Sequence, residues 1–171
     1  VLHNAPVVVW PHRWEHDKGP DLLLEAARAA RGHCPLKWVL LGEQFREVPE
    51  AIRVFQDEFG SDILHAGRIE DRSEYLAMLA SCDWVLSTAR HEFFGVAVVE
   101  AMWMGCLPWL PDRLSYPELQ PAGCSDLSPL NPPVDADAVR RQVREHLGPC
   151  CAGTAVECIE RELARAVAGL G

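Results

Sequence analysis

Short apolar runs alternate along the chain, as far as Pro111, with segments in which apolar residues recur every three or four positions. A short apolar run is typical of a buried strand, and the wider spacing is typical of a helix with one buried face. The runs that predict strands are Val7–Trp10, Leu36–Gly42, Ile63–Ala66, Trp84–Ser87 and Cys106–Leu110. The helices predicted between them are Asp21–Arg31, Val48–Phe59, Asp71–Ser81 and a helix that begins at Gly95 and ends at Gly105. This alternation predicts an α/β fold with a parallel sheet, right-handed crossovers and helices on both faces.

The pattern becomes irregular after Pro111. Prolines recur from there to Pro133 and exclude long regular elements, apart from a turn of helix at Ser115–Leu119. Two further helices are predicted at Asp135–Leu147 and Thr154–Leu170, the second with Thr154 as its N-cap. The chain has 171 residues, of which 49% are hydrophobic, so we expect one domain that covers residues 1–171.

Charge and hydropathy narrow the class of protein. The net charge is −9 and the pI is near 5.2. A chain that binds nucleic acid or a membrane surface by itself is expected to be basic, so neither class fits this composition. A local cluster of arginine and lysine could still bind phosphates. No apolar run approaches the roughly 20 residues that span a bilayer, and no signal-peptide pattern opens the chain. We therefore expect a cytoplasmic protein that does not associate with membranes.

Seven cysteines are dispersed along the chain, without a C-x-x-C pair or the spacing of His and Cys metal ligands. This pattern predicts free, mostly buried thiols in a reducing compartment. The adjacent Cys150 and Cys151 are the pair expected to oxidise most readily. No metal site is predicted.

The segment Ala89–Gly105 contains several candidate site residues. Its pattern predicts the loop and the helix that follow a buried strand. Free N–H groups at such a helix start favour an anion, and Gly95 lets the backbone approach a ligand closely. Glu92 lies before the helix and Glu100 inside it, so two carboxylates could hold the two ends of an elongated ligand. Spacing alone is weak evidence, since Glu50 and Glu58 are also eight residues apart.

The flanking residues are more specific than the spacing. His91-Glu92-x-Phe94-Gly95, followed by Glu100-Ala101-x-x-x-Gly105-Cys106, resembles the E-x7-E signature of the family 4 glycosyltransferases, which are retaining enzymes of the GT-B class. The resemblance implies a three-layer Rossmann-like domain that forms the C-terminal, donor-binding half of a GT-B enzyme. It also implies that the N-terminal, acceptor-binding half is absent from this chain, and that the reaction needs no metal or other cofactor.

The resemblance also implies a role for each site residue. Arg13 and Lys18 would be catalytic, because they bind the diphosphate of a nucleotide sugar and stabilise the charge that grows on the leaving oxygen. Glu92 would bind the hexose beside the reacting carbon, with the backbone N–H groups of Phe94, Gly95 and Val96, and Glu100 would bind the ribose hydroxyls. The remaining donor-binding residues would be His91, which orients the ligand, Gly42 in a glycine-bearing loop, and Arg68 and Ile69 against the base. Taken alone, Arg13 and Lys18 could be solvated surface cations, and Gly42 could simply turn the chain.

Three longer sequence motifs indicate a narrower group within this family: Trp10–Lys18 (WPHRWEHDK), Ser87–Ala97 and Tyr116–Glu118. Together they resemble the tRNA-queuosine alpha-mannosyltransferases over about Val7 to Leu119. That resemblance implies GDP-mannose as donor, queuosine in the anticodon of a tRNA for aspartate as acceptor, and tRNA as a partner of the full-length enzyme. The half present here is expected to bind donor weakly and to transfer nothing unaided.

Two alternatives stay open at this stage. The chain could belong to another family 4 enzyme, with a UDP- or GDP-sugar as donor and a lipid or polysaccharide as acceptor. It could also be a catalytically silent module that binds nucleotides or proteins. The sequence contains no G-x-G-x-x-G, which disfavours a dinucleotide-dependent dehydrogenase.

Overall fold

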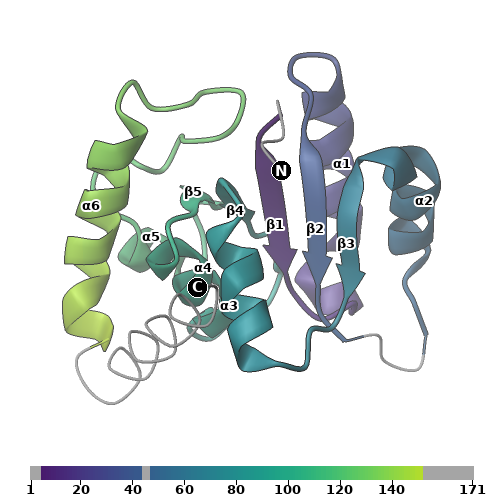
Figure 1. Ribbon diagram of the computed structural model, residues 1–171, viewed down its shortest axis with the longest axis horizontal. Coiled ribbons are helices and arrows are strands. Elements are labelled where there is room, and N and C mark those ends of the chain that lie inside the picture. Colours follow the sequence, from purple (N-terminus) through teal and green to yellow (C-terminus); the bar gives the residue numbers. More distant parts are fainter. Residues whose placement is uncertain (1–4, 44–46, 152–171) are drawn as a thin grey trace, which may run out of the picture.

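Five parallel strands form the predicted sheet. The computed structural model describes residues 5–43 and 47–151. Its strands are β1 (Val7–Pro11), β2 (Lys37–Leu41), β3 (Ile63–Gly67), β4 (Trp84–Leu86) and β5 (Leu107–Trp109). They lie in the order β3-β2-β1-β4-β5, and every pairing is parallel (Figure 1). The predicted strands are confirmed, with ends that differ by no more than one residue.

The helices follow the predicted spacing closely. They are α1 (Pro20–Arg31), α2 (Glu50–Phe59), α3 (Arg72–Ala80), α4 (Val96–Trp103), α5 (Tyr116–Leu119) and α6 (Ala136–Leu147), with 3-10 turns η1 (His16–Lys18), η2 (Gly60–Asp62) and η3 (Gly148–Cys151). The second helix begins two residues later than predicted, because Pro49 at its N-cap disfavours helical geometry at Val48. The η1 turn was not predicted, and the predicted helix Thr154–Leu170 lies outside the described residues.

Alternate side chains of β1 face two separate cores, which makes the domain three-layered. Val7 and Val9 pack in the cluster that contains residues of α3, α4 and α6. Val8 and Trp10 pack in the other cluster, with residues of α1 and α2. Helices therefore cover both faces of the sheet, as the alternation of strands and helices predicted (Figure 1).

The strand order brings two loops together. The chain moves outward from β1 to β3 and then returns to place β4 on the other side of β1, where Val8 pairs with Trp84 and Val9 with Val85. The loops that leave β1 and β4 at their carboxyl ends are therefore neighbours. Ligands of open α/β sheets bind at such a reversal of strand order.

The structure describes the side chains of four cysteines. Cys34, Cys82, Cys106 and Cys124 are free, and all but Cys34 are buried, as predicted. Burial raises the pKa of the Cys82 thiol to about 12, which keeps it protonated. Among residues 5–43 and 47–151 there is no helix with the length and apolar character needed to cross a membrane.

Candidate functional site

The loops after β1 and β4 border a cavity at the carboxyl edge of the sheet. Its volume is about 360 Å³, and its walls are Pro11, His12, Arg13, Lys18 and residues 92–97. The cavity brings together six residues singled out in the sequence, namely Arg13, Lys18, Glu92, Phe94, Gly95 and Val96. Two cations, one carboxylate and a glycine at a helix start thus share one site.

Backbone contacts hold the two loops in place. The backbone N–H of Arg90 donates to Asp17 O at 2.7 Å, and Thr88 Oγ1 donates to Lys18 O at 2.9 Å. Gly19 has φ 65°, and a Cβ there would lie 2.2 Å from Thr88 O, so only glycine allows this approach. The position of Lys18 is therefore determined by the packing of two backbones.

The ammonium group of Lys18 is surrounded by oxygen atoms. Its Nζ donates to His91 O at 2.9 Å and lies 3.4 Å from both Glu92 Oε2 and Asp17 Oδ2. The side chain is only 11% exposed. A buried cation of this kind needs opposite charge nearby, and here two carboxylates provide it. An anionic ligand at Lys18 would take over part of that neutralisation.

Arg13 lies on the more open side of the cavity. Its side chain is 54% exposed, and its Nη2 lies 3.3 Å from Glu15 Oε2. A surface ion pair of this kind contributes little to stability. Phe93, Phe94 and Val96 are exposed and form an apolar rim beside it.

Gly95 starts α4 in a conformation that favours glycine. Its φ is 83°, and a Cβ would lie 3.3 Å from Cε1 of Tyr116, so the ring of Tyr116 underlies the start of the helix. No side chain caps this helix start. Its first N–H groups and the positive end of the helix dipole are therefore available to an anion in the cavity.

Glu100 is one turn further along α4 and does not line the cavity. Two side chains of α3 hold its carboxylate. Arg72 pairs with Oε1, and the Tyr75 hydroxyl donates to Oε2 at 3.1 Å. Neither partner was predicted from the sequence.

The other predicted donor-binding residues also lie outside the cavity walls. Gly42 has φ 136°, and a Cβ there would lie 2.1 Å from His12 O, so its glycine is explained by backbone packing. The Arg68 guanidinium is exposed and lies 3.2 Å from Glu43 Oε1. Ile69 packs partly against the core, and His91 is exposed. Their roles in ligand binding stay predictions.

A series of buried, hydrogen-bonded polar side chains begins at His12 in the cavity wall. A hydrogen bond of 2.8 Å joins His12 Nε2 to Ser87 Oγ, and another of 2.6 Å joins Ser87 Oγ to Tyr116 OH. Burial, and then the charge of Lys18, lower the pKa of His12 to about 3, so the imidazole is neutral. The sequence gave no sign that these three side chains are partners.

We expect His12 to make stability depend on pH. Between pH 6.5 and about 3, the unfolded chain protonates this imidazole and the folded chain does not. The unfolded state then binds more protons, so the free energy of unfolding falls with falling pH by about 1.4 kcal/mol per unit from this group. In urea unfolding from pH 6.5 to 4.5, His12→Gln should remove that part of the slope. Equal slopes for both proteins would contradict the assignment.

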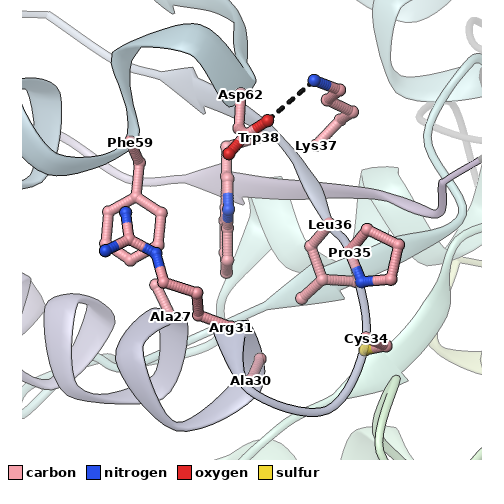
Figure 2. Close-up of a pocket in the computed structure, with 10 residues that line it drawn as sticks. All are labelled: Ala27, Ala30, Arg31, Cys34, Pro35, Leu36, Lys37, Trp38, Phe59 and Asp62. Atoms are coloured by element: carbon pink, nitrogen blue, oxygen red, sulfur yellow. Dashed lines mark hydrogen bonds and ion pairs between the residues drawn. The ribbon is translucent and has the colours of Figure 1, made fainter.

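A second cavity lies at the amino end of β2, and Figure 2 shows the residues that line it. It has a volume of about 260 Å³ and is bordered by the end of α1 and the start of β2. Its cations already have partners: Lys37 Nζ lies 2.7 Å from Asp62 Oδ1, and Arg31 stacks 3.9 Å over the Phe59 ring. None of the residues that line this cavity borders the site at the carboxyl edge.

No group of three or more His, Cys, Asp or Glu side chains in the described residues is arranged to hold a metal ion. The expectation that the reaction needs no cofactor stays a prediction.

Comparison with known proteins identifies relatives of the chain. The sequence profile of the family described as "Glycosyl transferases group 1" matches residues 2–118. The tRNA-queuosine alpha-mannosyltransferase of Drosophila melanogaster is 44% identical over 115 residues, which cover 67% of this chain and 30% of that protein. The chain therefore spans well under half the length of this relative.

Solved structures share the fold. The catalytic domain of cholesterol-alpha-glucosyltransferase from Helicobacter pylori aligns with a TM-score of 0.59 at 16% identity and covers 96% of this chain and 98% of that chain. Anabaena HepE in complex with UDP and glucose aligns with a TM-score of 0.65 at 19% identity and covers 97% and 49%. These neighbours are GT-B glycosyltransferases, which confirms the predicted Rossmann-like fold class.

Proposed function

Because the chain belongs to the glycosyl transferases group 1 family, we propose that it is the donor-binding half of a retaining glycosyltransferase that transfers mannose from GDP-mannose to queuosine in a tRNA for aspartate. The observation that carries this proposal is the cavity where Arg13, Lys18 and the α4 start converge beside Glu92. The Drosophila relative supports mannose and queuosine, since its name contains both.

The cavity suits the diphosphate of a nucleotide sugar. A diphosphate carries charge on several oxygen atoms, and Lys18, Arg13 and the N–H groups after Gly95 are three sources of positive charge at one cavity. When the bond between the sugar carbon and the phosphate oxygen breaks, negative charge grows on that oxygen. Cations already in place stabilise this charge without reorganising, which lowers the barrier.

Glu92 is the residue proposed to bind the mannose. It lies 3.4 Å from Lys18 Nζ, so a sugar held by its carboxylate would be next to the diphosphate. The acceptor hydroxyl then forms a bond to the sugar carbon on the face that the phosphate leaves. Its proton passes to the departing phosphate oxygen, so the chain needs no general base. We propose that Arg68, Ile69 and Gly42 contribute to the base-binding side.

The rest of the enzyme is proposed to supply the acceptor site. The match covers 30% of the Drosophila relative, which fits a chain that corresponds to one half of a two-domain enzyme. The net charge of −9 agrees with tRNA contacts carried mainly by the other half. A tRNA substrate and reduced cysteines both agree with a cytoplasmic location. The chain alone should show no transfer, and turnover by this chain alone would contradict this division.

Nucleotide preference tests the donor. Calorimetry with GDP, UDP and their mannose and glucose conjugates should show GDP binding at least about tenfold more tightly than UDP, since guanine offers more hydrogen-bonding groups and a larger stacking surface. The fold of UDP-bound Anabaena HepE is the observation that favours a second candidate, a UDP-sugar donor. Tighter binding of UDP would support that candidate and reject transfer from GDP-mannose.

A further inference from the structure

Two residues of α3 hold the carboxylate of Glu100, which belongs to the adjacent helix α4 (Figure 1). Arg72 pairs with Oε1, and Tyr75 donates its hydroxyl to Oε2 at 3.1 Å. Arg72 and Tyr75 are three residues apart, which places them on one face of their helix. The guanidinium carbon of Arg72 also lies 5.2 Å from the centre of the Tyr75 ring, so the two partners stabilise each other.

Each oxygen of the Glu100 carboxylate has one of these partners. An ionised carboxylate has about four lone-pair sites, two on each oxygen, so each oxygen can accept a further hydrogen bond. The Glu100 side chain is 16% exposed, so its two partners do not seal it from solvent. Burial, and then the charge of Glu100, raise the pKa of the Tyr75 phenol, so Tyr75 stays a donor.

Glu100 is the only charged residue of α4, which is otherwise apolar. Val98, Val99, Ala101 and Met102 are buried around Glu100 and contribute the apolar contacts of the helix. A carboxylate in such a run is costly unless it is fully paired. Two donors from another helix offset that cost and also fix the plane of the carboxylate, since rotation would break one of the two bonds.

We propose that Arg72 and Tyr75 are positioning residues that orient the Glu100 carboxylate for the two hydroxyl groups of a ribose. This inference rests on the proposed function, because it takes a nucleoside diphosphate as the ligand. A carboxylate held in one orientation loses no further side-chain freedom when it binds a diol, which strengthens the pair of hydrogen bonds. Arg72 and Tyr75 therefore determine the preference for ribose over deoxyribose without touching the sugar.

The ratio of affinities for GDP and 2′-deoxy-GDP tests this inference. By calorimetry, the wild-type chain should bind GDP about tenfold more tightly, as expected for one charge-assisted hydrogen bond. Tyr75→Phe and Arg72→Gln should each reduce this ratio to about threefold, because they release one carboxylate oxygen. Arg72→Lys, which keeps the charge but not the planar fork, should give an intermediate ratio.

Arg53 provides a matched control for Arg72. It is also an exposed helical arginine paired with a glutamate, Glu50, and Arg53→Gln should keep the tenfold ratio. A loss of folding would lower both affinities together, whereas loss of orientation changes their ratio. Tyr75→Phe is a conservative change that keeps the test informative if Arg72→Gln fails to fold.

Three results separate this inference from the function it rests on. A reduced ratio in the α3 variants, with the control unchanged, supports it. An unchanged ratio in both α3 variants, or a wild-type chain that binds GDP without preferring ribose, overturns it and leaves the donor site intact. A wild-type chain that binds no GDP contradicts the proposed function itself.

Discussion

Lys18→Ala should weaken GDP binding by about 100-fold, or about 2.8 kcal/mol, which is the largest effect that we expect at the cavity. Lys18 is the less exposed of the two cations, and its Nζ lies 3.4 Å from both Glu92 and Asp17. Without it, these carboxylates face the diphosphate unneutralised, so the variant adds repulsion to the lost attraction. The half-exposed Arg13 should matter less, and Arg13→Ala should cost about tenfold.

Lys37 is the matched control for this experiment. It also forms a lysine–carboxylate pair, 2.7 Å from Asp62, but at the amino end of β2 (Figure 2). Lys37→Ala should leave GDP binding unchanged in calorimetry, with the same buffer and ionic strength for all variants. If Lys18→Ala bound GDP within about threefold of the wild type, the diphosphate would not lie at Lys18.

Gly42→Ala should lower the free energy of unfolding by about 3 kcal/mol, because the new Cβ overlaps backbone atoms. The Cβ would lie 2.1 Å from His12 O and 2.7 Å from His12 C, and φ is 136°, where side chains are rarely found. Neither the strand exit at Gly42 nor the loop at His12 can move without disturbing Arg13. The melting temperature should therefore fall by about 6–12 °C, and GDP binding should weaken as well.

Gly67→Ala distinguishes steric overlap from backbone strain. Gly67 has φ 129°, close to that of Gly42, but no atom lies within 4 Å of an added Cβ. Only the strain remains, so this variant should lose about 1 kcal/mol. Chemical denaturation of both variants gives the comparison. Equal losses would show that strain alone explains the glycine at position 42.

The sequence predicted most of the secondary structure because the hydrophobic spacing of each segment matches the helix or strand that it forms. Val7–Trp10 and Trp84–Leu86 are apolar throughout, as strands covered on both faces must be. The η1 turn at His16–Lys18 was missed because a single 3-10 turn has no hydrophobic period to detect. The start of α2 was misplaced because the apolar Val48 continues the helical spacing across Pro49.

The candidate site was only partly predictable. Arg13, Lys18, Glu92 and Gly95 were found because their motifs resemble those of a known family, and they meet because the ends of parallel strands lie at one edge. Arg72, Tyr75, Ser87 and Tyr116 were missed because each is an ordinary residue in its own segment. Their importance comes from contacts with residues at least 25 positions away, such as Tyr75 with Glu100 and Ser87 with Tyr116.

The sequence alone therefore determined the strands, the helices and the loops in which charged residues and glycines gather, because these depend on periodicity and on the chemistry of neighbouring residues. Only the tertiary structure decided which groups meet: the carboxylates around Lys18, the α3 residues that hold Glu100, and the buried, hydrogen-bonded side chains from His12 to Tyr116. Hydrogen bonds and ion pairs require a few ångströms between atoms. That proximity arises when the sheet places β4 beside β1, and a local sequence pattern does not predict it.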